Sequence, residues 1–303
     1  MFNFWKPSRK NELQAGIALS PDRLAFALVN RCDPESHEIV DLASIACVDQ
    51  HEQNQALTDL RKRHQLNKIP CTFILNPDQY AFIQIEAPNV ETDELKSAVR
   101  WRIKDMLDFH IDDATIDAFS LPLSARQSAV QLMYVVAARS PLIQSVVDRL
   151  LAVDINLTAI DINELALHNL TTTQLENDQQ VVAACYRLHD SFYIVISDKN
   201  QMYLCRHIDD YTVPGSEGEL DYNQLALEIQ RSLDYYESQY GKGAVAQLSV
   251  FSNRKNTPNP ADYFQLPVVR ADLDNLLPKL NEYSDDVIMH CLSALGGALR
   301  SEP

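Results

Sequence analysis

The pattern of hydrophobic and polar positions predicts an α/β chain that opens with strands. Apolar residues alternate over 14–30, with a break at Ser20-Pro21-Asp22, which is typical of two strands joined by a turn. Later apolar runs recur in alternation or at helical spacing, which predicts strands that alternate with helices. The elements expected next are a strand from 38, a helix over 52–65, strands over 71–75, from 80 and over 131–139, a helix capped by Ser140 with Pro141 at its first position, a strand from 157 and a further helix.

Residues 91–117 combine an amphipathic helix with a strand-like tail. Thr92 can cap the helix, and Leu95, Val99 and Ile103 recur on one face as an apolar stripe. Trp101 lies roughly opposite that stripe, on a charged face with Lys104. Such an indole either packs on its own protein or contacts a partner. Arg100, Trp101 and Lys104 are therefore candidate partner-binding residues, because Trp and Arg dominate binding hot spots.

The second half of the chain repeats the theme of the first. Three strands are expected over 181–208, and they echo the strands over 14–48. A long helix follows, with Asp221 and Gln224 placed for a capping box and Gly241 at its end. Tyr235 lies off the apolar stripe of this helix and is a further candidate contact residue. A helix is also expected from 273, and another closes the chain.

These patterns predict a duplicated α/β architecture with an inserted α+β subdomain in the first half. The division expected is a first subdomain over 1–83 and 156–178, the insertion over 84–155, and a second half over 179–303 with its helical part at about 215–243.

Composition and charge restrict the function. The chain has 303 residues, 46% of them hydrophobic, and a net charge of −16. This acidity argues against nucleic acid, because phosphate binding needs a basic face. It suits a neutral or basic partner, although acidic surfaces often serve only solubility.

The six cysteines are scattered along the chain, which is typical of buried thiols in a reducing compartment. The sequence contains no run of about 20 apolar residues, the length needed to span a bilayer. We therefore expect a cytoplasmic protein. The aromatic and basic segment 1–10 could touch an anionic membrane, or it could simply fray.

Segments 98–119 (AVRWRIKDMLDFHIDDATIDAF), 225–241 (LALEIQRSLDYYESQYG) and 292–300 (LSALGGALR) resemble the PilM-type proteins of type IV pilus assembly. The nearest likeness is to the MshI branch, which belongs to the mannose-sensitive haemagglutinin (MSHA) pilus. The order of the intervening strands fits as well. The resemblance implies a duplicated actin-like (ribonuclease H-like) fold, with the insertion at the position of residues 91–117. It also implies a groove beside the insertion that takes the cytoplasmic N-terminal tail of a PilN-like bitopic inner-membrane protein. The protein would then lie peripherally at the inner membrane and connect to the pilus platform and motor.

The same resemblance assigns a nucleotide cleft whose loops are degenerate here. Active relatives resemble one another in a first phosphate loop with an acid and small residues; the matching stretch runs from Gly16 through Ser20 and has Ala18 at the acidic position. The second loop is matched by 183–189, where Tyr186 would crowd the phosphate. By family position Glu228, Arg231 and Ser232 would lie near ribose and base, unless they form a solvated helix face. The seven glycines are few against an average usage of roughly 7%.

We therefore expect no catalytic residue, no bound metal and no ATP hydrolysis, although weak ATP binding stays open. The spacings of His, Cys and Ser match no metal or nucleophile motif. The leading hypothesis is a non-catalytic pilus scaffold that binds a membrane protein's tail. Three alternatives remain: an ATP-binding switch of the same machine, the cytoplasmic L-type component of a type II secretion system, and a sugar or acetate kinase of the same superfamily.

Overall fold

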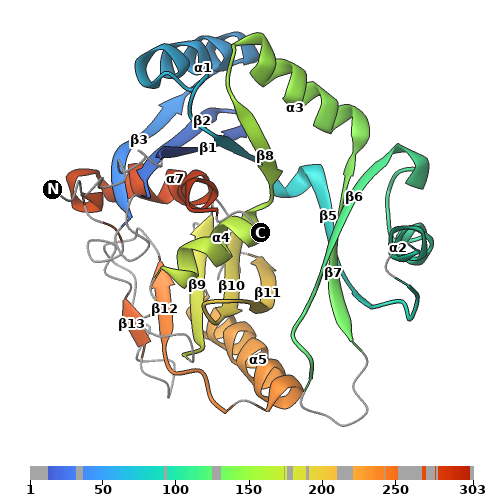
Figure 1. Cartoon of the computed structure of the whole chain (residues 1–303). Coiled ribbons are helices and arrows are strands. Elements are labelled where there is room, and N and C mark those ends of the chain that lie inside the picture. Colours follow the sequence, from blue (N-terminus) through green and yellow to red (C-terminus); the bar gives the residue numbers. More distant parts are fainter. Residues whose placement is uncertain are drawn as a thin grey trace, which may run out of the picture.

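The computed structural model describes residues 13–31, 37–91, 94–124, 131–173, 175, 180–188, 191–209, 221–241, 243–251, 268–270, 277 and 279–300. Two five-stranded sheets and one three-stranded sheet organise this part of the chain (Figure 1). The two larger sheets lie one above the other in Figure 1, and the small sheet stands beside them.

The first sheet has the strand order β3-β2-β1-β4-β8. Strands β1, β2 and β3 form the expected antiparallel meander; β4 pairs with β1 in parallel, and β8 pairs with β4 in parallel. Helices α1 and α3 cover its outer face, where Leu57, Leu60, Val146 and Leu150 are buried. The elements are β1 (Leu13–Ser20), β2 (Arg23–Asn30), β3 (Glu38–Ala46), α1 (Gln50–His64), β4 (Cys71–Ile74), α3 (Ser140–Ala152) and β8 (Leu157–Asp161).

The second sheet repeats this topology, with the order β11-β10-β9-β12-β13. Helix α5 (Tyr222–Tyr240) covers its outer face with the predicted stripe, which includes Ile229, Leu233 and Tyr236. The Asp221 carboxylate accepts hydrogen bonds from the amides of residues 223 and 224, and Gly241 ends the helix at a φ of 58°. The strands are β9 (Val182–Leu188), β10 (Ser191–Ser197), β11 (Met202–Asp209), β12 (Leu248–Phe251) and β13 (Val268–Arg270). The duplicated α/β fold expected from the strand pattern is confirmed.

Helices α4 (Asn163–Thr172) and α7 (Asp285–Ala298) lie between the two large sheets (Figure 1). Helix α7 contacts strands of both sheets, and α4 contacts α7 and strands of the second sheet, so one hydrophobic core joins the halves. A short 3₁₀ turn, η4 (Leu280–Glu282), precedes α7. No helix in the described part of the chain is long and apolar enough to cross a membrane.

The inserted unit is a three-stranded antiparallel sheet of order β5-β7-β6 with one helix on it. Helix α2 covers one face, where Val99 and Ile103 pack on Ile85, Met133 and Val135. The elements are η1 (Pro77–Gln79), β5 (Tyr80–Glu86), α2 (Leu95–Ile103), η2 (Ile111–Asp113), β6 (Ala114–Ser120) and β7 (Leu132–Arg139).

Several local features differ from the sequence-based expectations. Strand β5 begins at Tyr80, before the expected division at 84, and α3 and α7 both pack on the first sheet although they fall in the ranges 84–155 and 179–303. The Ser140 cap was wrong: Arg139 is the N-cap of α3, and the Ser140 hydroxyl bonds that of Thr115 at 2.9 Å. The Thr92 cap, the helix expected from 273 and the segment 1–10 lie outside the described residues.

Candidate functional site

The stretch matched to the first phosphate loop is built into the fold. A Cβ added to Gly16 would lie 1.8 Å from the Ala294 carbonyl oxygen, so the glycine lets β1 approach α7. The Ser20 hydroxyl donates to Asp22 Oδ1 at 2.9 Å within the turn between β1 and β2. Gly16 thus serves close packing, and Ser20 serves the turn.

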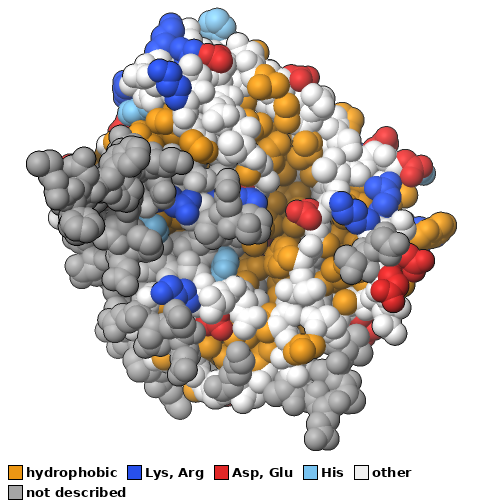
Figure 2. Space-filling model, in the orientation of Figure 1, with side chains coloured by type: hydrophobic (Ala, Val, Ile, Leu, Met, Phe, Trp, Pro, Cys, Tyr) orange, Lys and Arg blue, Asp and Glu red, His pale blue; other side chains and the backbone are white. Residues whose placement is uncertain are grey.

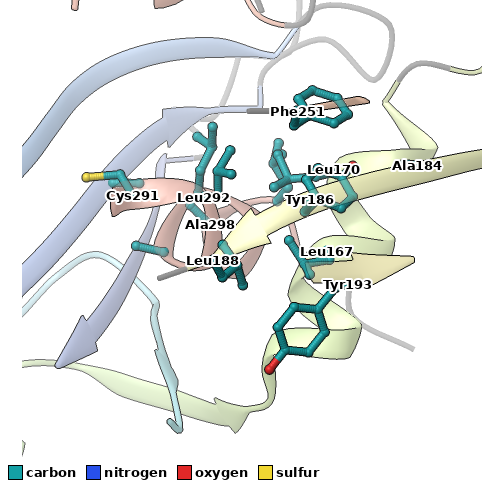
Figure 3. Close-up of a cluster of buried hydrophobic side chains, with 14 of the residues drawn as sticks. Leu167, Leu170, Ala184, Tyr186, Leu188, Tyr193, Phe251, Cys291, Leu292 and Ala298 are labelled. Atoms are coloured by element: carbon teal, nitrogen blue, oxygen red, sulfur yellow. The ribbon is translucent and has the colours of Figure 1, made fainter. Parts of the chain in front are cut away.

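The position matched to the second phosphate loop is filled by aromatic side chains. Tyr186 on β9 is fully buried and stacks on Phe251 of β12, with ring centroids 4.4 Å apart and planes 12° from parallel. Its hydroxyl pairs with that of Thr171 on α4 at 3.0 Å. Figure 3 shows these rings beside Leu170, with Leu292 in the same cluster. Protein side chains therefore occupy the space between the halves at this point.

The three candidate residues on α5 bond to one another and to their own sheet. Glu228 is buried and accepts from Arg231 Nη1 at 2.5 Å and from Arg206 Nη2 at 2.7 Å. The Ser232 hydroxyl donates to the Glu228 carbonyl at 2.9 Å. The structure brings Glu228, Arg231 and Ser232 together, and the buried Glu228 carboxylate and the Ser232 hydroxyl have partners within the protein, whereas the Arg231 side chain is 57% exposed.

The candidate contact residues on α2 have different environments. The Trp101 side chain is 71% exposed, and the Lys104 ammonium lies 4.7 Å from its ring centroid. Arg100 donates to the Ile111 carbonyl at 2.6 Å and thereby ties α2 to η2. Tyr235, on α5, accepts from Gln84 Nε2 at 3.2 Å and joins α5 to the inserted sheet. Of these residues Trp101 and Lys104 offer the free surface.

The face of the inserted sheet opposite α2 packs on the main body. Phe82 stacks on Tyr134 with ring centroids 4.2 Å apart, and Phe119 lies beside both. The Tyr134 hydroxyl donates to the carbonyl of Cys205 on β11. This contact holds the insertion against the second sheet, on the side away from Trp101.

An apolar groove runs between the two edge strands that face this junction. Strand β8 is the edge of the first sheet, β6 is the edge of the inserted sheet, and α3 contacts both. Figure 2 shows a recessed band of hydrophobic side chains down the middle of this face. The half-buried Leu157, Ala159 and Ile160 belong to β8, and Leu157 and Ile160 also pack against the core on the outer face of the first sheet. We call the space between β8 and β6 the edge-strand groove.

Carboxylates gather near one end of the edge-strand groove. Asp161, at the end of β8, is buried, pairs with Arg300 at 2.9 Å, and has its pKa raised by burial, with the Asp117 charge on β6 acting in the same direction. Burial also raises the pKa of Glu164, at the start of α4, to about 7, and its carboxylate accepts from the Tyr80 hydroxyl at 2.6 Å. Asp117 itself is exposed.

Sequence reasoning did not single out Asp117, Asp161 or Glu164. Their signals were weak: a lone acid in an alternating strand, one at a strand end and one in an apolar helix. Within the described ranges, no three His, Cys, Asp or Glu side chains come close enough together to hold a metal ion.

Comparison with known proteins identifies the fold. No protein-family model and no curated protein matches the chain. Among solved structures, the chain is similar to a PilM–PilN type IV pilus biogenesis complex, with a TM-score of 0.67 and 18% identity over 96% of this chain and 98% of the other. It is also similar to the cytoplasmic domain of EpsL, an inner-membrane component of the type II secretion system of Vibrio cholerae, with a TM-score of 0.52 and 12% identity over 86% of each chain. A Bacteroides thetaiotaomicron protein of unknown function with an actin-like ATPase fold gives a TM-score of 0.49 and 8% identity over 97% of this chain and 99% of the other. The first two of these similarities show that the chain has a PilM-like, actin-like fold.

Proposed function

We propose that the protein is a cytoplasmic scaffold of type IV pilus assembly that binds the N-terminal tail of a PilN-like inner-membrane protein. The observation that carries the proposal is the fold likeness to the protein of the PilM–PilN complex, which extends over nearly the whole chain and includes the inserted sheet. The MSHA pilus is the system we assign to it, because segments 98–119 and 225–241 resemble its MshI branch.

The edge-strand groove suits an extended tail. Edge strands carry backbone N–H and C=O groups without a strand partner on one side, and an incoming segment can pair with them. Half-buried aliphatic side chains of β8 offer apolar contacts, and Asp117 offers a charge on the β6 side. A tail with alternating apolar side chains and at least one basic residue would satisfy all three features.

We further propose that this scaffold works without ATP hydrolysis. Tyr186 and Phe251 fill the place of the second phosphate loop, and Gly16 is pressed against α7. Glu228 has two guanidinium partners already. A nucleotide would have to displace a stacked aromatic pair and the guanidinium partners of the buried Glu228 carboxylate, and a buried carboxylate without a partner is costly. An ATP-driven switch of the same machine is the alternative that these contacts disfavour.

Trp101 and Lys104 receive a different role in this proposal. Helix α2 lies on the face of the inserted sheet opposite the main body, so a tail in the edge-strand groove would not contact them. We assign their exposed surface to a second component, the pilus platform or motor, because an exposed indole beside a cation is a frequent hot spot. The protein would reach the inner membrane through its tail-bearing partner.

The likeness to the EpsL cytoplasmic domain favours one other candidate function. A cytoplasmic L-type component of a type II secretion system would have the same fold and a similar position below the inner membrane. Binding of a PilN-type tail, and not of secretion-system partners, distinguishes the two.

One calorimetric experiment tests the proposal. The full chain is titrated with Mg-ATP and with a synthetic tail peptide of the PilN-type protein from the same organism, each alone and then together. We expect saturable tail binding that weakens with salt, no heat from ATP, and no effect of ATP on the tail. Micromolar ATP binding would overturn the scaffold assignment, and absence of tail binding would overturn the partner.

A further inference from the structure

A hollow of about 110 Å³ lies on the outer side of the first sheet, away from both the edge-strand groove and the space between the halves. The residues that line it come from β1, α1, β4, η1 and α3, and none comes from β6 or β8. One wall is apolar. It is formed by Leu19, Phe73, Leu142, Val146 and Leu150.

Arg149 supplies a positive charge at this hollow, and two amide side chains fix its position. Its Nε donates to Asn54 Oδ1 at 2.6 Å and its Nη2 donates to Gln53 Oε1 at 2.9 Å. The Gln53 amide nitrogen donates in turn to the Ser20 carbonyl at 2.7 Å, which sets the oxygen toward the guanidinium. The arginine is therefore held rigidly between α1 and α3.

The charge of Arg149 has no counter-ion among the residues that the structure describes. Both of its acceptors are neutral amides, and no described carboxylate lies within ion-pair distance. Burial lowers its pKa, yet a guanidinium stays protonated at any physiological pH. A role as a tie between α1 and α3 explains Nε and Nη2. That role does not account for the Nη1 group, which makes no hydrogen bond to a described residue. It does not account for the hollow beside Nη1 either.

We propose that this hollow binds a short aliphatic carboxylate. The carboxylate would pair with the guanidinium of Arg149 through Nη1, and Gln50, Gln79 and Ser145 in the same lining offer further polar contacts. The hydrocarbon part would pack on Leu142 and Val146. Such a ligand supplies both the missing negative charge and the missing apolar contacts, and its site is independent of the tail and of nucleotide.

The test compares a charged probe with its neutral isostere on the full chain. Binding of 3-methylbutanoate and 3-methylbutanamide is followed by amide shifts of Ser145 and its neighbours in nuclear magnetic resonance spectra. We expect saturable shifts with the carboxylate, with a Kd of about 1 mM for so small a ligand, and binding at least about tenfold weaker for the amide. Equal binding of acid and amide, or no saturable shift up to about 10 mM, would overturn the proposal.

Two variants connect the effect to the arginine. Arg149→Gln should weaken carboxylate binding about tenfold or more, and Arg149→Lys, which keeps the charge but not the fork, should fall between. Arg102→Gln makes the same charge change on the exposed face of α2 and should leave binding unchanged. If Arg149→Gln fails to fold, the acid–amide comparison on the wild-type chain still decides the matter.

A further pair of probes identifies the source of the carboxylate. N-acetyl-leucine presents the branched side chain and carboxylate as the end of a polypeptide would, whereas 3-methylbutanoate represents a free metabolite. Tighter binding of the former assigns the site to a protein terminus, and tighter binding of the latter assigns it to a small molecule. Both results support a carboxylate site.

Discussion

Tyr186 of β9 and Phe251 of β12 stack nearly parallel, 4.4 Å between ring centroids, where the actin-like fold brings its two halves together. The pair joins strands that are neighbours in the second sheet and reaches α4 through the bond from Tyr186 to Thr171. In this chain the junction between the halves is therefore a piece of hydrophobic core. A junction of this kind stabilises the protein, whereas a nucleotide cleft needs open polar space.

Tyr186→Ala is expected to destabilise the protein by about 3–5 kcal/mol. The change removes a fully buried ring, leaves a cavity between β12 and α4, and removes one of the two hydrogen bonds of the Thr171 hydroxyl, which still donates to the Leu167 carbonyl. Urea unfolding followed by circular dichroism measures the loss. Tyr235→Ala is the matched control. Its ring is at the surface and makes one exposed hydrogen bond to Gln84, so it should cost about 1 kcal/mol or less. Similar losses for the two variants would mean that the stacked pair does not hold the halves together.

Gly16→Ala is expected to destabilise the protein by about 3 kcal/mol or more, because the added methyl group would overlap the backbone of α7 at Ala294. The neighbour is backbone within a buried helix and cannot move aside cheaply. Thermal unfolding of purified protein measures the change. The control is Gly243→Ala, where φ is +85° but nothing lies within 4 Å of the new methyl, so only backbone strain of about 1–2 kcal/mol is expected. A Gly16→Ala protein as stable as the Gly243→Ala protein would contradict the close approach of β1 to α7.

Much of the fold could be predicted from the sequence because its signals are local. The meanders over 14–48 and 181–208 follow from alternation, and Asp221 and Gly241 define the ends of α5 through their own backbone chemistry. The Ser140 cap failed because a non-local partner, Thr115, competes for the hydroxyl. The placement of α7 on the first sheet has no local signal, since it depends on Gly16 far away in the chain.

The candidate site was less predictable than the fold. Tyr186 could be recognised as too bulky for a phosphate loop, but its stacking partner Phe251 comes from a separate strand. Glu164 looked like one acid in an apolar helix, and its environment depends on Tyr80, 84 positions away in the sequence. The environments of Tyr186 and Glu164 depend on burial and on partners far away in the sequence. The hydrophobic periodicity of the neighbouring residues predicts neither.

Glu164 should make stability fall as pH rises toward neutrality. Burial raises its pKa in the folded protein from the model-compound value of 4.5 to about 7, so the folded state binds the proton more tightly than the unfolded state. The stabilisation from the protonated form is complete below about pH 4.5 and is lost as pH rises through 7, a change on the order of 3 kcal/mol. His168 acts in the opposite sense. Burial lowers its pKa to about 4, so its contribution is lost as pH falls from 6.5 through 4.

Comparison of the wild type with Glu164→Gln isolates the carboxyl group. The glutamine oxygen can still accept from the Tyr80 hydroxyl, so packing and hydrogen bonding are nearly preserved. The difference in unfolding free energy between the two proteins should grow in favour of the variant from pH 4.5 to 7 and stay constant above. Urea unfolding at a series of pH values gives that difference, in which the contribution of His168 cancels. A difference independent of pH would show that Glu164 titrates normally.

Trp101→Ala and Asp117→Asn should separate the two surfaces that we assign to partners. Trp101 stands on the solvent side of α2, across the inserted sheet from the main body, so Trp101→Ala should change the Kd for the tail peptide by no more than about twofold. Asp117, on the edge strand β6, should contribute as an exposed ion pair does, and Asp117→Asn should weaken tail binding about two- to fivefold and reduce its salt dependence. Calorimetry at two salt concentrations measures both effects. A tail that binds normally to Asp117→Asn but poorly to Trp101→Ala would place the tail site on the outer face of α2 and not in the groove. The three-stranded sheet stands between these two surfaces, so a short extended segment could not bury its side chains on both.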